Sequence, residues 1–207
     1  MRGICDSGAG GDMRTHIVLA CVSMLGCAGT LSIQGASPTV DWKSILPEVQ
    51  SVAKKEFRDA GGYYPVSISR VADVTGEGTS EALIDFGCCG AYAHAMTVMR
   101  IEDGKPVVAL FRGRDGKIAS TEFLEGASVM HGAAVELDTT EHAVFSGYWD
   151  MNSEGTKIAR CGGEAYQWNA AAKRFDYNGR LSDRLTKDFC RKVRAQLPLR
   201  STMKRNG

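Results

Sequence analysis

Neither sign of charge dominates this 207-residue sequence, which has 25 lysines and arginines, 24 aspartates and glutamates and a formal net charge of +1. It also lacks a cluster of basic residues interleaved with aromatic ones, the usual footprint of a nucleic-acid-binding surface. Basic residues do occur between 187 and 205, but they are spread along a predicted helix and tail, as on a solvated face. Glycine-rich phosphate-binding loops are missing as well. We therefore expect no nucleic-acid partner.

The apolar run Ile17–Leu25 has nine residues, too few to span a bilayer as a helix. Its length suits the hydrophobic region of a secretory signal, with Arg14 before it and small residues after it. Met13 is the better start residue, because residues 1–12 are glycine-rich and include acidic residues. We predict that residues 1–36 are an N-terminal extension plus a secretory signal. The protein is then expected to reach the bacterial periplasm or cell envelope.

Two outcomes of processing fit the end of this signal. Met24–Cys27 resembles a bacterial lipobox, which predicts lipidation of Cys27. Ordinary cleavage near Ala28 or within residues 30–36 is the alternative, and a buried N-terminal helix is a third interpretation. Contact with a membrane is expected only through the lipid anchor.

Export changes the interpretation of the seven cysteines. Three of them lie within or before the signal, and the other four are expected to form two disulfides in an oxidising compartment. The first three are Cys5, Cys21 and Cys27, and the remaining four are Cys88, Cys89, Cys161 and Cys190.

Alternation along the predicted strand 82–89 suggests which cysteines pair. Cys88 shares its more apolar face with Ile84 and Phe86, and that face should pack on the helix that carries Cys190. We predict Cys88–Cys190 and Cys89–Cys161, and set aside a Cys88–Cys89 bridge because adjacent cysteines close a strained ring. The rival hypothesis is a metal or nucleophile site using Cys88, Cys89 and His94, although this spacing matches no tetrahedral zinc pattern.

Helical periodicity occurs near both ends of the rest of the chain. Apolar residues repeat at helical spacing from Trp42 to Phe57, and again from Ser182 to Leu197, before Pro198. Such stripes are typical of helices that pack on a core. We expect one domain over residues 37–198, followed by a disordered basic tail over residues 199–207.

Between the two helices the sequence alternates as antiparallel strands do, with hairpin signals at Asp103-Gly104 and Asp115-Gly116. No strand–helix–strand alternation is present, which argues against a parallel sheet. The predicted fold class is α+β: mainly an antiparallel meander with one N-terminal and one C-terminal packing helix. The predicted strands are 66–71, 82–88, 95–101, 107–112, 117–123, 133–137, 143–150, 157–161, 164–168 and 174–177.

The loop 73–81 places oxygen-bearing side chains at every second position, with two glycines among them, ahead of an apolar strand. Such a loop wraps a hard cation or imitates one with hydrogen bonds. It resembles the calcium loop of FG-GAP/VCBS repeats, the blade units of integrin-α-type propellers. The resemblance implies calcium held by Asp73, Thr75, Glu77 and Glu81; the alternative is a metal-free turn in which Asp73 and Thr75 bond to backbone N–H groups. The motif occurs once, so a full propeller is not expected.

Candidates for catalysis are few. His94, in Gly87–His94, could meet the thiol of Cys88, and His131 follows Ser128 by three residues. A disulfide at Cys88 would remove the first nucleophile, and the helical periodicity that should follow a nucleophile elbow is missing after Ser128.

Aromatic residues concentrate on the last three predicted strands. Tyr166 and Trp168 share one face of a strand, and Phe175 and Tyr177 share a face of the next. Core packing is the first interpretation, and a stacking platform for a glycan or peptide, including Tyr148, is the second.

These observations favour an exported, non-catalytic bacterial envelope protein that acts as a binding or scaffolding module for a protein or glycan. No cofactor is expected apart from calcium as the single candidate. The alternative is a small secreted hydrolase that uses His94 or His131 with a nearby cysteine, serine or carboxylate.

Overall fold

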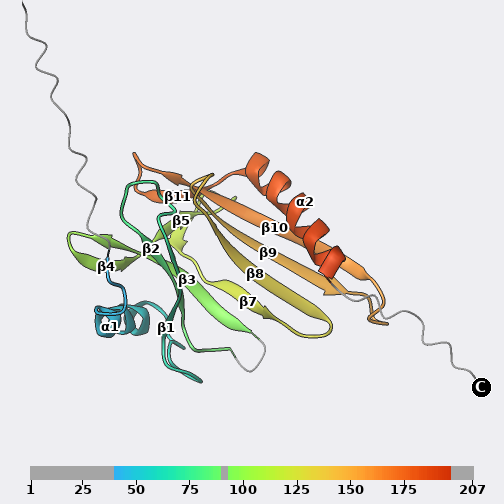
Figure 1. Ribbon diagram of the computed structural model, residues 1–207, viewed down its shortest axis with the longest axis horizontal. Coiled ribbons are helices and arrows are strands. Elements are labelled where there is room, and N and C mark those ends of the chain that lie inside the picture. Colours follow the sequence, from blue (N-terminus) through green and yellow to red (C-terminus); the bar gives the residue numbers. More distant parts are fainter. Residues whose placement is uncertain (1–39, 90–92, 197–207) are drawn as a thin grey trace, which may run out of the picture. The chain divides into compact units, whose positions relative to one another are not determined.

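The computed structural model describes residues 40–89 and 93–196. These residues form two α-helices and an eleven-stranded, mostly antiparallel sheet, with a helix near each end of the described chain (Figure 1). The α+β prediction is confirmed, and the sheet is not a propeller. The elements are α1 (Leu46–Glu56), β1 (Ser67–Ala72), β2 (Glu81–Asp85), β3 (His94–Glu102), β4 (Lys105–Val108), β5 (Leu110–Arg112), β6 (Ile118–Ser120), β7 (Phe123–Ala127), β8 (His131–Asp138), β9 (Ala143–Met151), β10 (Ile158–Asn169), β11 (Arg174–Tyr177) and α2 (Gly179–Gln196).

The sheet departs from a simple meander in its middle. Strands β1, β2 and β3 are sequential neighbours, and so are β7 to β11, but β5 pairs in parallel with β11. Only Ala109 separates β4, which pairs with β3, from β5. Residues 105–112 therefore pair with β3 through β4 and with β11 through β5. The sequence predicted a single strand over residues 107–112.

The sheet curls around an interior core that draws on strands from β2 to β11. Its fully buried members include Leu83, Val98, Phe111 and Phe175. Phe111 stacks on Phe175 with ring centroids 5.1 Å apart and meets the Tyr166 ring edge-on. The inward alternation predicted for the aromatic strands is therefore confirmed, with Phe111 and Phe123 as further members of the cluster.

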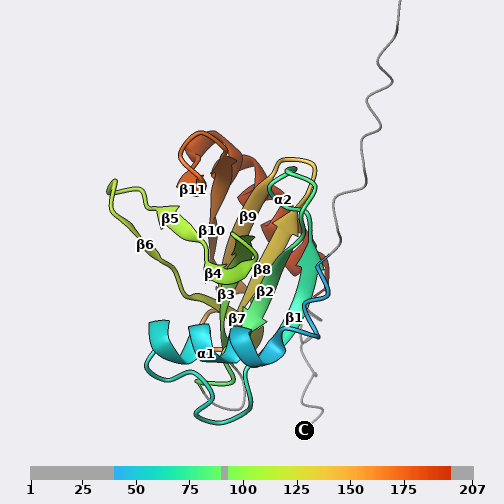
Figure 2. The same cartoon turned by 90° about the vertical axis from the view of Figure 1, so that its left-hand side faces the viewer.

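Helix α1 covers the other face of β2 and β3, in the part of the sheet that also holds β1 and β4 (Figure 2). Val49 and Ala53 are completely buried there. The segment before the helix is anchored by Trp42, whose indole N–H donates to the carbonyl oxygen of Ser80 at 3.1 Å. The predicted N-terminal packing helix is confirmed.

Helix α2 covers the outer face of β9 and β10. Phe189 packs on Phe145, with ring centroids 5.7 Å apart. The close approach needs Gly147 on β9, because a Cβ there would collide with the rings of both Phe189 and Phe145. Cys190 of α2 is joined to Cys161 of β10 by a disulfide.

The predicted disulfide pairing, Cys88–Cys190 with Cys89–Cys161, is wrong. It assumed that the C-terminal helix covers the strand leading to Cys88, but α1 covers that strand and α2 lies on β10. Cys88 and Cys89 are instead bonded to each other, with Cys88 buried and Cys89 exposed.

The predictions for the N-terminal segment 1–36, for Cys27 and for the tail 199–207 lie outside the described residues. Across 40–89 and 93–196, neither helix combines the length and the apolar character needed to cross a membrane.

Candidate functional site

The loop between β1 and β2 is held together by its own carboxylates. The two oxygens of Asp73 accept backbone N–H bonds from Gly76 at 2.8 Å and Gly78 at 2.9 Å. Glu81 accepts the N–H groups of Val74 and Thr75, and the Thr75 hydroxyl donates to it at 3.1 Å. These hydrogen bonds tie the two ends of the turn together.

Glu81 is almost completely buried, and burial raises its pKa, although the hydrogen bonds from Thr75 and Val74 oppose the rise. Of the four predicted calcium ligands, Asp73, Thr75 and Glu81 meet in one network. Glu77 accepts a hydrogen bond from the indole of Trp168 at 3.0 Å instead. Among the residues that the structure describes, no group of three histidine, cysteine or acidic side chains is arranged to hold a metal ion. Calcium binding at this loop stays a prediction.

His94 lies at the start of β3 beside the end of β2. Its Nδ1 is 2.9 Å from an oxygen of Asp85, without the alignment of a hydrogen bond, and the two groups form an ion pair only when the imidazole is protonated. Asp85 also accepts the N–H of Gly87 at 2.7 Å. Because the sulfur of Cys88 is bonded to Cys89, these cysteines supply no thiolate for this imidazole. The arrangement has a base and its partner carboxylate but no cysteine nucleophile.

His131 and Ser128 form a turn between β7 and β8. The Ser128 hydroxyl lies 3.3 Å from Nδ1 of His131 and accepts the backbone N–H groups of Met130 and His131. The serine side chain is therefore occupied in shaping the turn. No acidic side chain forms an ion pair with His131 within the described residues, so the carboxylate–histidine arrangement of a triad is not built here.

The aromatic residues proposed as a binding platform are separated. Tyr166 is buried, so the prediction of Tyr166 as a surface residue is wrong. Its hydroxyl donates to Glu164 at 2.6 Å. Burial, together with this hydrogen bond, raises the pKa of Tyr166. Tyr148 is 49% exposed but sits on β9 over Gly162. Gly162 is about 17 Å along β10 from Gln167, at the usual rise per strand residue. Of the proposed platform residues Tyr148, Tyr166 and Trp168, it is Trp168 that lines a pocket open to solvent.

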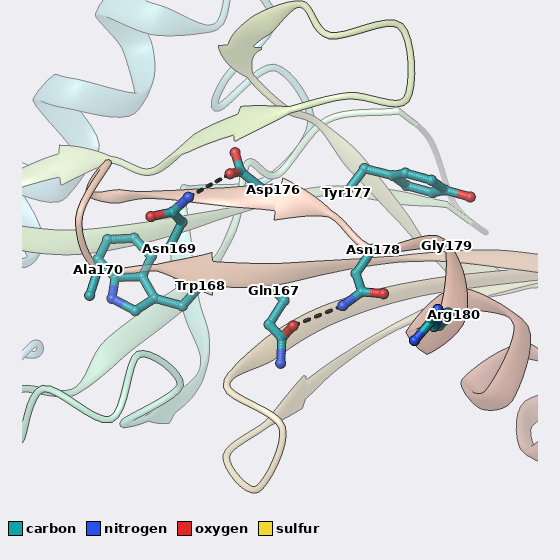
Figure 3. A pocket seen from close by; sticks show the side chains of 9 residues that line it. All are labelled: Gln167, Trp168, Asn169, Ala170, Asp176, Tyr177, Asn178, Gly179 and Arg180. Atoms are coloured by element: carbon teal, nitrogen blue, oxygen red, sulfur yellow. Dashed lines mark hydrogen bonds between the residues drawn. The ribbon is translucent and has the colours of Figure 1, made fainter. Parts of the chain in front are cut away.

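That pocket is an open groove of about 700 Å³ along β10, β11 and the start of α2 (Figure 3). Gln167 and Asn169 of β10 pair across the ladder with Asp176 and Arg174 of β11, so their side chains share the outer face of the two strands. Asn178 follows at the beginning of α2. Trp168 and Tyr177 also line the groove, but their rings lie on the core-facing side of the strands, where Trp168 packs on Phe175 and Tyr177 on Tyr166.

The amides of the groove are fixed by hydrogen bonds at both ends. Asn178 donates to Gln167 at 2.8 Å (Figure 3). Gln167 in turn donates to the carbonyl of Glu141 at 3.0 Å. Asn178 also accepts the N–H of Leu181, which caps α2. Because an amide nitrogen carries two hydrogens and its oxygen two lone pairs, each side chain keeps further capacity for a ligand.

Asp176 is the acidic centre of the groove. Partial burial favours its neutral form, but the hydrogen bond from Asn169 at 2.8 Å and the ion pairs with Arg174 and Arg112 outweigh it and lower its pKa. It is therefore ionised at neutral pH, with its charge compensated by two arginines.

Sequence reasoning identified Trp168 but missed the amides around it. Their signal was present: polar residues occupy positions 167 and 169 on one strand and 174, 176 and 178 after the turn, which is alternation on a shared outer face. The aromatic residues of the same strands occupy the opposite face.

Comparisons of the chain with protein families, curated proteins and solved structures gave no match.

Proposed function

We propose that this protein is an exported, non-catalytic bacterial envelope protein that acts as a binding module, and that the groove between β10 and β11 holds a glycan. The observation that carries the proposal is the row of fixed amides, Gln167, Asn169 and Asn178, along the groove. Sugars present hydroxyl groups that pair with amide donors and acceptors. An open groove also admits a chain that continues past both ends.

The preorganised amides support binding in a second way. A side chain that is already held by hydrogen bonds loses little rotamer freedom when a ligand arrives, so less of the interaction energy is spent on ordering. Gln167 and Asn178 bond to each other, and Asn169 is held by Asp176 and by the N–H of Ala172. The groove thus has a fixed pattern of donors and acceptors before any ligand binds.

Within the described residues, the nucleophiles considered for catalysis are engaged elsewhere, which supports a non-catalytic role. The sulfur of Cys88 is in a disulfide, and the Ser128 hydroxyl accepts backbone N–H groups of its turn. The His94–Asp85 contact is the one feature that favours the hydrolase alternative.

Export rests on the signal-like run Ile17–Leu25 and on the two disulfides, which are compatible with an extracellular or periplasmic location. We propose that the chain is anchored to the envelope through a lipid on Cys27. Anchoring would keep a binding module close to the cell surface without a membrane-spanning segment.

Gln167→Leu tests the groove, because it keeps the side-chain size and removes the amide. We expect the wild-type protein to bind members of an oligosaccharide panel in calorimetric titrations, and the variant to bind about tenfold more weakly, as loss of roughly one good hydrogen bond implies. Gln50→Leu is the matched control, since Gln50 on α1 donates to Val66 at 3.2 Å, away from the groove. Binding that is equal in both variants, or no binding by the wild type, would contradict the proposal.

A further inference from the structure

We infer that the Cys88–Cys89 disulfide is a thiol-exchange site, where a dithiol reduces the bond to two cysteine thiols. The inference is independent of the proposed glycan groove, because it uses no residue of that groove. Its evidence is the contrast between the two disulfides. Cys88–Cys89 joins neighbours and has one exposed partner, whereas Cys161–Cys190 joins β10 to α2 and has one buried partner.

The two disulfides differ in how easily an attacking thiol reaches them. Cys89 is exposed, and together with Cys88 and residues of the segment 58–63 it lines an open cavity of about 370 Å³. Cys190 is 6% exposed and packs among the buried residues between α2 and the sheet, with Cys161 half-buried beside it. Thiol–disulfide exchange requires that a thiolate reaches a sulfur, so Cys89 is the accessible target.

The backbone that leads into Cys88 and Cys89 is held by hydrogen bonds that do not involve the sulfurs. The carbonyl of Gly87 accepts the N–H groups of Tyr63 and Tyr64, both at 2.8 Å. A disulfide between neighbours closes no loop in the unfolded chain, so reducing it costs the fold little. The bond is therefore able to open and close while the protein stays folded.

The reduction takes place in two exchange steps. A thiolate of the dithiol attacks Sγ of Cys89, the Cys88–Cys89 bond breaks, and its electron pair leaves with the sulfur of Cys88, which takes up a proton. The second sulfur of the dithiol, as a thiolate, then attacks the first sulfur of the same molecule and releases Cys89, which takes up the other proton. The protein gains two electrons and two protons, and the dithiol becomes a disulfide.

The adjacency of the two cysteines favours a dithiol over a single thiol as the reductant. After the first step Cys88 remains next to the mixed disulfide on Cys89, and its thiolate restores the original bond by expelling the incoming thiol. This return is intramolecular and therefore has a high effective concentration. A dithiol carries its second sulfur at similarly close range and competes with the return, whereas a monothiol needs a second molecule to arrive.

Differential alkylation of the native protein tests the inference. The protein exported from the full-length chain would be treated with dithiothreitol, or with glutathione at the same thiol concentration, and trapped with iodoacetamide. Mass spectrometry of the peptides would then identify the modified cysteines. We expect dithiothreitol to reduce Cys88–Cys89 at least about tenfold faster than Cys161–Cys190, and glutathione to reduce it more slowly than dithiothreitol does. The far-ultraviolet circular dichroism of the protein should not change when Cys88–Cys89 opens.

Two double variants serve as matched controls. Cys161→Ala/Cys190→Ala should keep the fast reduction, whereas Cys88→Ala/Cys89→Ala should lose it. Equal rates for the two disulfides of the wild type, or no alkylation of Cys88 and Cys89 before denaturation, would overturn the inference. Loss of the folded spectrum on reduction of Cys88–Cys89 would also overturn it, because the bond would then be structural. Equally fast reduction by glutathione would overturn the choice of a dithiol as the reductant.

Discussion

Glu81 shows how one buried carboxylate organises the loop between β1 and β2. Its carboxylate accepts two backbone N–H groups and the Thr75 hydroxyl, in the position where the family resemblance implies a metal ligand. Asp73 does the same for two glycine N–H groups. Asp73 and Glu81 thus supply acceptors for backbone donors of the loop.

Glu81→Ala and Glu81→Gln separate the hydrogen bonds of this residue from its charge. The alanine variant leaves the Thr75 N–H without its acceptor, and we expect it to lower the free energy of unfolding by about 2 to 4 kcal/mol. Glutamine keeps an oxygen for the N–H groups and should cost clearly less. Urea denaturation at pH 7 measures both, and equal losses would show that the charge itself holds the loop.

The same residue gives a dependence on pH. Burial raises the Glu81 pKa above its ordinary 4.5, so the folded protein binds a proton more readily than the unfolded chain. The stabilising effect of that proton is fully present below pH 4.5 and is lost as the pH rises through the folded-state pKa. Relative to wild type, Glu81→Gln should therefore gain stability between pH 4.5 and pH 7. A difference that does not change with pH would contradict the raised pKa.

At the scale of elements, the two disulfides have unequal roles. Cys161–Cys190 joins β10 to α2 across 29 residues, whereas Cys88–Cys89 joins neighbours and closes no chain loop. The stabilisation expected from restricting the unfolded chain grows with the loop that a disulfide closes.

We expect Cys161→Ala/Cys190→Ala to lower the free energy of unfolding by about 3 kcal/mol and Cys88→Ala/Cys89→Ala by no more than about 1 kcal/mol. Denaturant melts of the two double variants against wild type provide the measurement. A larger loss from the Cys88/Cys89 pair would mean that the vicinal bridge holds the β2–β3 connection in place.

Element by element, periodicity predicted both helices, because each presents a continuous apolar stripe to one face of the sheet. It could not predict which strands each helix covers. That choice depends on sheet order, and the disulfide pairing was wrong for this reason. The sequence also did not predict the break at Ala109, because the residues on both sides of it are apolar while the pairing partner changes from β3 to β11.

At the scale of the molecule, the envelope hypothesis predicts the chemistry of the exported chain. When the full chain is expressed in a bacterium, we expect a processed protein in the envelope fraction, with no thiol from Cys88, Cys89, Cys161 or Cys190 reacting before or after denaturation. Cys27→Ser should release it from the membrane fraction if the lipobox is used. A reactive thiol from one of these four cysteines in the denatured protein would contradict the disulfides and would support the alternative of a cysteine hydrolase.

At the scale of the whole molecule, the sequence also did not predict the groove. Trp168 was singled out because it is aromatic, but the site depends on the outer face of β10 and β11, where Gln167, Asn169 and Asp176 meet. The polar alternation was visible in the sequence. The sequence could not show that α2 begins beyond this face and leaves it open, because this depends on how the elements are arranged in space.

The central claim is that the β10–β11 groove is where this protein binds. Titrating the ¹⁵N-labelled protein with the tightest-binding glycan, while observing the side-chain NH₂ resonances of asparagine and glutamine, tests it most directly. The account predicts that the signals of Gln167, Asn169 and Asn178 shift together in a saturable manner while that of Gln50 stays fixed. Shifts confined to residues around Asp85 and His94, with the groove amides unmoved, would contradict it.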